Sequence, residues 1–401
     1  MGKDSRGGEP AAGETFDLQE RIRGRVRQAI EAVIEEELTL ALGAGEGVRV
    51  ESRTGYRHGQ KIRRVVTEDG PRDLAIPRGR IFREDGRDEE WHSDLLPRYQ
   101  RRARKVDEVI LGAYLAGANS RRIRKALQPL LGAQFLSKSA ISRIVGRLRG
   151  VFDTWRSRDL SQEKCVYLYL DAMRLPVRMA RRVVKVPVQA VVGVRPDGQK
   201  VLLSLEIAGS ESTASWTAVV KGMADRGLPA PLLVILDGNA GLVRAVRETW
   251  PKAVIQRCTK HKLENLLAKA PGHCHPEIRR DYAQITHPAS PEEAHQAYEA
   301  FLRKWRPLCP SVAESLEEAG QMLLTFTRFP RSQWKSLRTT NAIERLNEEF
   351  RRRTKTQGSF RHEASALTLL WGLVAFGQIV LRKIDGWEEV AKVMSDSQAA
   401  A

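Results

Sequence analysis

The segment Leu232–Leu236 constrains the fold most, because it joins a fully apolar run to an aspartate and a turn. It reads LLVIL and continues as Asp237-Gly238-Asn239. An apolar run of this length between turn residues predicts a short strand that is buried on both faces. Such strands belong to sheets covered by helices, so the segment indicates an α/β protein. The carboxylate of Asp237 can make an Asx-turn, or it can be half of a metal site.

Strand and helix patterns alternate on both sides of this segment. Residues 164–209 predict three linked strands, and residues 210–227 predict a helix. After Leu236, a helix that Asn239 can cap is followed by a strand over 253–258 and a helix over 259–270. This order describes a mixed sheet with helices on its faces, and it matches the ribonuclease H-like fold. Residues 265–333 have no strand signal and predict a helical insertion.

The N-terminal third has a different organisation. Residues 16–42 have helical apolar spacing, and residues 48–95 predict short strands with Asp-Gly turns. Further on, Ser120 can cap a helix over 121–131 that Gly132 ends, and Ser137 can cap a helix over 138–149. Two short basic helices joined by a turn fit a helix-turn-helix, although an ordinary basic helical hairpin fits as well. The candidate DNA contacts on these helices are Arg121, Arg122, Lys138, Ser139, Ser142 and Arg143.

The charge of the chain favours a polyanionic partner. Lys and Arg number 67 against 49 Asp and Glu, which gives a net charge of +18. Between Arg98 and Gly150 there are 13 Lys or Arg and only two acids, Asp107 and Glu108. Nucleic acid is the usual partner of such a surface, and a solvated basic surface is the alternative.

Cysteine content and hydropathy bear on the compartment. Four cysteines are too few for a disulfide scaffold in a chain of 401 residues, so we expect a protein of the reducing cytoplasm. The N-terminus lacks the apolar core of a signal peptide. The most apolar segment, residues 367–381, is too short to span a membrane and predicts a buried helix within residues 364–381.

Three acids stand where a metal site could form. Asp171 follows the apolar run YLYL, Asp237 follows LLVIL, and Glu344 lies in a helical segment that begins near Asn341. Carboxylates at the ends of neighbouring strands can meet, and a helix packed across the sheet can add a third. Such a cluster repels itself unless cations neutralise it, and its hard oxygen donors suit Mg²⁺ or Mn²⁺. Two such ions can clamp a phosphodiester.

Each acid also has a purely structural interpretation. Asp171 can bond to nearby backbone, and Asp237 can make an Asx-turn. Glu344 and Asn341 have the spacing of a capping box. Taken singly, these interpretations are at least as good as catalysis. When the three acids are considered together, on this strand order and in a basic chain, a metal triad is about as well supported as the structural interpretations.

Other residues accompany the acids. Cys258 and His261 form a C-x-x-H pair, and His273-Cys274-His275 follow; either could contribute to a zinc site, but Cys258 also suits a small apolar strand end. His261 could face the acids or a phosphate. Trp305 can be a packing residue or can stack on an unpaired base. The basic run after Glu344 is either a solvated charge run or a contact with a DNA backbone, through Arg351, Arg352 and Lys355.

At these residues the chain resembles bacterial insertion-sequence transposases of the Mutator type, a branch of the DDE transposases. The motifs are YLYLDAMRLPVR, ILDGNAGLVRAVRETWPKAVIQRCTKHKLENL and LRTTNAIERLNEEFRRRTKTQGSFRHEASALTLLW, with GYRHGQKIRRV and SKSAISRIVGRL nearer the N-terminus. The resemblance implies that Asp171, Asp237 and Glu344 are the DDE triad. It implies that Cys258 and His261 are the C-x-x-H signature, and that Trp305 is a characteristic tryptophan of the insertion.

The resemblance also implies a function and partners. The expected protein is a transposase that binds terminal inverted repeats and uses two Mg²⁺ or Mn²⁺ ions to cleave DNA and join it to target DNA. It would act as a homodimer or higher multimer in the bacterial cytoplasm, near the nucleoid, without a membrane. The alternatives are a DNA-binding regulator derived from a transposase and a ribonuclease H-like nuclease or resolvase. The predicted parts are a tail (1–15), a helix and small β region (16–97), a helix-turn-helix domain (98–155), a catalytic domain in two parts (156–264 and 334–385) around the helical insertion (265–333), and a C-terminal tail (386–401).

Overall fold

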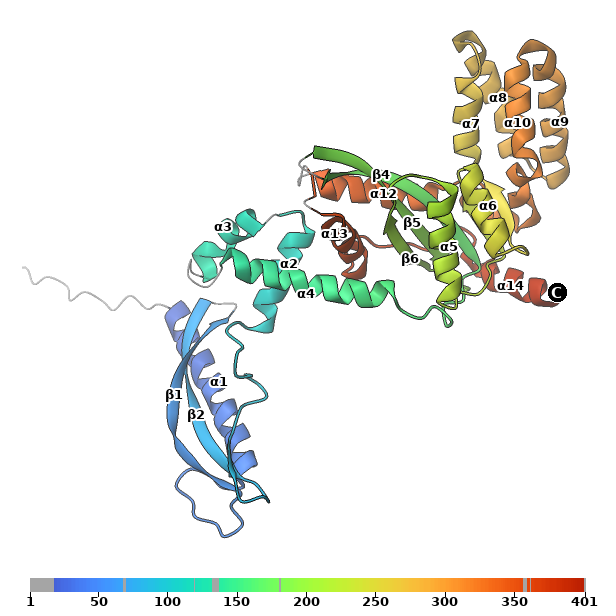
Figure 1. The fold of residues 1–401 in the computed structure, drawn as a ribbon. Helices are drawn as coiled ribbons and strands as arrows, with labels where there is room; N and C mark the ends of the chain where they lie inside the picture. The colour runs from blue at the N-terminus through green and yellow to red at the C-terminus, as the bar shows by residue number, and fades with distance from the viewer. Residues whose placement is uncertain are drawn as a thin grey trace, which may run out of the picture. The chain divides into compact units, whose positions relative to one another are not determined.

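The structure is a computed structural model that describes residues 18–67, 70–118, 120–131, 137–179, 182–355, 359–360 and 362–399 (Figure 1). The predicted N-terminal tail and Gly132 therefore lie outside the described residues. The chain divides into two compact units. The first unit contains the chain up to Tyr114 together with Ser120–Ile144. The second unit contains the short segment between these two parts and the chain from Val145 onward. Each unit is described separately.

The first unit begins with a helix packed on an antiparallel hairpin. Helix α1 (Leu18–Leu42) buries Ile34 and Leu38 against the sheet formed by β1 (Gly55–Thr67), β2 (Gly70–Phe82) and the short β3 (Asp88–Glu90). The predicted helix and strands are present, but β1 and β2 are each 13 residues long rather than short. They remain paired over this length because their register continues with one shift, between Arg57 and Gln60.

Three helices follow, α2 (Arg104–Leu115), α3 (Ser120–Leu131) and α4 (Lys138–Arg156). Ser137 caps α4 as expected, because its Oγ accepts a hydrogen bond from the amide of Ala140 at 3.1 Å. Helix α4 is longer than the predicted 138–149. Its last turns belong to the second unit, where Phe152 and Trp155 pack against Trp371 with ring centroids 5.8 and 6.0 Å apart.

The second unit is built on a five-stranded mixed sheet of order β6-β5-β4-β7-β8. Strands β4 (Tyr167–Met179), β5 (Arg182–Val194) and β6 (Lys200–Ile207) pair in antiparallel fashion. Strands β7 (Leu233–Leu236) and β8 (Val254–Arg257) add to β4 in parallel. The mixed α/β prediction is therefore confirmed.

Side chains of β4 alternate between two helical layers, as the two-residue period of a strand requires. Leu168 and Leu170 are in the hydrophobic cluster with α5 (Thr213–Asp225) and α6 (Ala240–Thr249). Tyr167 and Tyr169 face the other side, where their hydroxyls bond Gln333 and the carbonyl of Ser336. Helix α12 (Asn341–Thr354) packs against β4 and α13 (Glu363–Ala375) packs against β6.

The residues of the predicted insertion, 265–333, are helical, and their helices form a bundle with α7 (Thr259–Ala268), which begins before residue 265. Helices α7, α8 (His275–Thr286), α9 (Pro291–Leu308) and α10 (Pro310–Ala319) lie side by side (Figure 1). Short 3-10 turns and α11 (Trp334–Leu337) lead back to α12. Helix α13 ends at Ala375, six residues before the predicted end, because the chain turns through Gly377 at φ +70°. The C-terminal segment forms α14 (Val390–Ala399). Among the described residues, no helix is long and apolar enough to cross a membrane.

Candidate functional site

The sheet register places Asp171 and Asp237 on one face of adjacent strands. Tyr169 on β4 is the partner of Ile235 on β7, and each aspartate lies two residues beyond its member of this pair. Since side chains two apart in a strand share a face, both aspartates lie on the face opposite the α5–α6 layer. Asp171 does not end its strand as expected, because β4 remains paired with β5 up to Met179. Only its pairing with β7 ends nearby.

Asp171 is held by an amide from α12. The side-chain Nδ2 of Asn347 donates a hydrogen bond to Oδ2 of Asp171 at 2.8 Å, and Asn347 itself is 1% exposed. Burial raises the pKa of Asp171 to about 6; the negative charges of Asp237 and Glu344 act in the same direction, and His261 opposes them. The charges of Asp237 and Glu344 therefore act on the Asp171 carboxylate.

Asp237 makes the Asx-turn that the sequence allowed. Its Oδ1 accepts a hydrogen bond from the amide of Asn239 at 2.8 Å, and Oδ1 of Asn239 in turn caps α6. Gly238 has φ +93°, which a glycine tolerates and a side chain does not. The turn and the candidate ligand are thus the same feature, since the turn fixes one carboxylate oxygen at the strand end.

Glu344 lies in the first turn of α12 and has three polar neighbours. Nζ of Lys260 donates to its Oε2 at 2.6 Å, and the hydroxyl of Thr340 donates to its Oε1 at 2.8 Å. Nε2 of His261 lies 3.9 Å from Oε1. Burial alone would raise the pKa of Glu344, but the hydrogen bonds from Lys260 and Thr340 outweigh it and lower the pKa.

The capping-box interpretation of Glu344 is wrong. Thr340, rather than Asn341, is the N-cap residue of α12, and no side chain caps the helix there. The Glu344 carboxylate turns instead toward Lys260 and the Thr340 hydroxyl, which are better donors for an anion than the N-cap amide.

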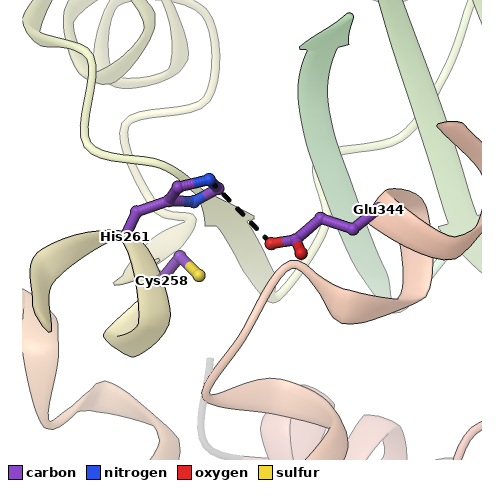
Figure 2. Close-up of side chains that lie close together, drawn as sticks. All are labelled: Cys258, His261 and Glu344. Carbon is purple, nitrogen blue, oxygen red and sulfur yellow. Dashed lines mark ion pairs between the residues drawn. The ribbon is translucent and has the colours of Figure 1, made fainter. Parts of the chain in front are cut away.

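Cys258 and His261 lie beside Glu344 (Figure 2). Cys258 is fully buried at the start of α7. The amide of Thr340 donates a hydrogen bond to its Sγ at 3.4 Å, and the hydroxyl oxygen of Thr340 lies 3.2 Å from Sγ. The interaction with Cys258 and the nearby charges of Glu344 and Asp171 raise the pKa of His261 to about 9. The C-x-x-H pair therefore connects the start of α7 to the start of α12.

The closest set of ligand atoms differs from the predicted triad. Among the described residues, one group of three or more His, Cys, Asp or Glu side chains has ligand atoms within 4.8 Å of one another, and it is Cys258, His261 and Glu344. Asp171 and Asp237 lie outside this group, and so do the residues His273-Cys274-His275. Nε2 of His275 lies 3.1 Å from the carbonyl oxygen of Ala270 instead.

Trp305 lies in the core of the helical bundle. It is 1% exposed, its ring packs against Phe301, and its Nε1 donates to Oδ2 of Asp281 at 3.0 Å. These contacts favour packing over stacking on a base, the two roles that the sequence left open.

The predicted DNA contacts fall on two surfaces. Exposed side chains on α3 and α4 are Arg121, Arg122, Ser139, Ser142 and Arg143, and Lys138 is the first residue of α4. At the end of α12, Arg351, Arg352 and Lys355 are exposed, and Arg352 pairs with Glu349 at 2.6 Å. The first surface lies in the first unit and the second surface lies in the second unit.

Sequence reasoning missed three residues at the site. Asn347 lies one helical turn after Glu344, a spacing that could have indicated it. Lys260 lies inside the C-x-x-H motif itself. Arg257, at the end of β8, is 4% exposed and lies against Gly238, and no local signal distinguishes it from a surface arginine.

Fold and site together define a mixed α/β protein in which acids from two adjacent strands and a helix gather beside a Cys-His pair. Comparison with known proteins identifies the class further. The family model described as "Transposase, Mutator family" matches residues 8–378. The chain therefore belongs to the Mutator family of transposases.

Named relatives agree over most of the chain. The chain is 35% identical to the transposase for insertion sequence element ISRM5 of Rhizobium meliloti, over 88% of this chain and 86% of that protein. It is 33% identical to the transposase for IS1081 of Mycobacterium tuberculosis, over 92% of this chain and 86% of that protein. The transposase for IS256 in transposon Tn4001 of Staphylococcus aureus is 28% identical over 88% of each chain.

Proposed function

We propose that the protein is a metal-dependent DDE transposase of an insertion sequence, with a ribonuclease H-like catalytic unit. It would bind the terminal inverted repeats of its element, cleave DNA there and transfer the freed 3′-hydroxyl to target DNA. Two transposon ends must be brought together, so a homodimer or higher multimer is the expected active form. Family membership and the strand order β6-β5-β4-β7-β8 support this proposal.

One observation carries the catalytic assignment. Asp171 and Asp237 lie on one face of adjacent parallel strands, and α12, which packs against β4, brings Glu344 close enough to raise the pKa of Asp171. Two negative charges that raise the pKa of a third carboxylate favour a cation at the site.

The donors of this site fit divalent metal ions. All three are hard oxygen ligands, and Oδ1 of Asn347 is a buried acceptor without a hydrogen-bond partner in the described chain. Asp171, Asp237 and Glu344 would hold Mg²⁺ or Mn²⁺. Two such ions would activate the attacking oxygen and stabilise the leaving oxygen in phosphoryl transfer. The Cys258 thiol is a softer metal ligand, and its contacts with the amide and hydroxyl of Thr340 support a positioning role.

The surrounding residues orient Glu344 and moderate its charge. Thr340 donates to one oxygen of Glu344 and to Cys258, so the C-x-x-H segment fixes the start of α12. Lys260 balances part of the carboxylate charge. His261, with its raised pKa, is a cation at neutral pH that can contact the phosphate being transferred.

Two features near the site suit a DNA backbone. A cavity of about 430 Å³ adjoins the Asp237 turn and is lined by Gly238, Arg244, Arg247 and Arg257, among others. Exposed basic side chains follow Glu344 at the end of α12. Helices α3 and α4 would bind the inverted repeats as a helix-turn-helix, with the exposed face of α4 in the major groove.

Replacement of Asp237 by Asn tests the proposal. We expect Asp237→Asn to abolish Mg²⁺-dependent end cleavage and strand transfer and to leave end binding intact. Asp197→Asn is the matched control, because Asp197 also makes an Asx-turn, with Oδ1 2.9 Å from the amide of Gln199, and is exposed in the turn between β5 and β6. Strand transfer at the wild-type rate by Asp237→Asn would refute the triad.

The same assay separates the alternative functions. Incubation of the wild-type protein with end-containing DNA, target DNA and Mg²⁺ should give joined products. Cut but unjoined DNA would favour a nuclease or resolvase. Specific binding without any metal-dependent cutting would favour a regulator derived from a transposase.

A further inference from the structure

We propose that Glu318, on helix α10 of the insertion, is a positioning residue that fixes both flanks of the C-x-x-H segment and the turn that carries Asp237. This inference rests on the proposed function, and it gives the insertion a role in catalysis. It concerns a carboxylate that lies before Glu344 in the chain, is not part of the acidic triad, and lines the cavity next to the Asp237 turn.

The first contact is to Arg257, which immediately precedes Cys258. Nη1 of Arg257 lies 2.6 Å from Oε1 of Glu318, and the arginine side chain is 4% exposed. Among the described residues, Nε of Arg257 has no hydrogen-bond partner, so Glu318 supplies the ionic contact of this buried guanidinium. A buried cation that loses its carboxylate must move toward water or remain unpaired at high cost.

Arg257 in turn contacts the turn after β7. A Cβ placed on Gly238 would lie 2.3 Å from Nε and 2.4 Å from Nη2 of Arg257, so the guanidinium packs directly on the glycine backbone. Gly238 follows Asp237 in the chain. The position of Glu318 is therefore transmitted through Arg257 to the backbone next to the Asp237 carboxylate.

The second contact is to Lys262, which immediately follows His261. Nζ of Lys262 lies 2.8 Å from Oε2 of Glu318 and also donates to the carbonyl of Ser315 at 2.8 Å. The lysine side chain is 2% exposed. One carboxylate thus binds two buried cations, one on each side of the segment Cys258–His261, and this segment holds Thr340 and Glu344.

The arrangement explains how a bundle inserted between Asp237 and Glu344 can support both. The carboxylate of Glu318 ties α10 to the end of β8 and to the first turn of α7, so the bundle and the sheet are fixed relative to each other at the site. Displacement of a reacting group by about 1 Å can reduce a rate roughly 100-fold. Loss of the Glu318 charge should therefore reduce catalysis more than it reduces DNA binding.

Glu318→Gln tests the proposal in the full-length protein, with Glu317→Gln as the matched control. Glu317 is the preceding residue of α10 and pairs with Arg306, whose side chain is 60% exposed. We expect Glu318→Gln to lower the rate of end cleavage roughly 10- to 100-fold and to raise the Mg²⁺ concentration needed for half-maximal cleavage. Glu317→Gln should resemble the wild type in both. Neither variant should weaken the binding of transposon ends, because each removes a negative charge.

A second variant distinguishes positioning from folding. Lys262→Met combined with Glu318→Gln removes the unpaired buried lysine, so it should recover part of the melting temperature that Glu318→Gln loses. Cleavage and the Mg²⁺ requirement should stay impaired, because Arg257 still lacks its carboxylate. If cleavage recovers together with the melting temperature, or if Glu318→Gln has a wild-type rate and Mg²⁺ requirement, the positioning role is wrong. Failure of the wild-type protein to cleave in Mg²⁺ would instead refute the proposed function.

Discussion

The hydrogen bond from Asn347 to Asp171 leads to a quantitative prediction about pH. Asn347 is buried and donates to a carboxylate whose pKa burial has raised to about 6. Asn347→Leu keeps the volume and removes the donor. A hydrogen bond to a charged group contributes about 1.5–3 kcal/mol, and one pH unit corresponds to about 1.4 kcal/mol. We therefore expect the pKa of Asp171 to rise by a further one to two pH units.

The sign of the effect on activity follows from the charge that a cation requires. A cation binds the ionised carboxylate, so a proton on Asp171 competes with it, and activity falls as the pH drops through the pKa. In Asn347→Leu this fall should occur about one to two pH units higher than in the wild type. Activity near neutral pH should then be low and should recover at alkaline pH or at higher Mg²⁺ concentration.

The assay is Mg²⁺-dependent cleavage of a labelled transposon end between pH 5.5 and 9.5, with folding checked by circular dichroism at each pH. Asn341→Leu is the control, because Asn341 is an exposed residue on the same helix. An unchanged pH midpoint in Asn347→Leu would refute the reasoning. A uniform loss of rate at every pH would do so too, because it would mean that Asn347 acts on folding rather than on the Asp171 proton.

Three further substitutions test single contacts. Gly238→Ala should lower the melting temperature, because Gly238 has φ +93° and a Cβ there would lie 2.3 Å from Arg257. Gly222→Ala in α5 is the control. Its Cβ would have nothing within 4 Å, so the change should be neutral or stabilising by up to about 1 kcal/mol. Arg247→Ala should weaken DNA binding similarly for all sequences and reduce the slope of log affinity against log salt by about 1, in a filter-binding titration. Cys258→Ala should destabilise the protein by about 1–3 kcal/mol in a denaturant titration, because the buried amide of Thr340 loses its acceptor, and Cys258→Ser should cost less.

The secondary structure of the second unit was largely predictable because its strands have recognisable patterns in the local sequence. The apolar run that ends at the Asp237 turn identified β7, and β4 lies within the three strands predicted over 164–209. The observed register then places Asp171 and Asp237 on one face. The length of α4 could not be predicted in this way. Its last turns are stabilised by Trp371, more than 200 residues away, and no periodicity within residues 138–156 contains that contact.

The site was predictable as a set of acids but not as a set of contacts. Position after an apolar run or on a helix is a local property, and it selected Asp171, Asp237 and Glu344 as candidates; their catalytic role stays a prediction. The hydrogen-bond donors that hold these acids depend on contacts between segments that are distant in the sequence. Thr340 bonds both Glu344 and Cys258 only because α7 and α12 meet. The capping-box prediction was wrong for the same reason, since a donor from another element competed successfully with the local amide.

The role of Glu318 could not be predicted from the local sequence. Glu314, Glu317 and Glu318 lie in one segment, SVAESLEEAG, and nothing in the segment ranks them. In the structure Glu317 meets an arginine that is mostly exposed to water, while Glu318 meets two cations that are almost wholly buried. An exposed pair contributes little, but a carboxylate that is the anion for two buried charges cannot be lost without moving them. Because those charges flank the C-x-x-H segment, the insertion is coupled to the acidic site through a residue whose own side chain is 59% exposed.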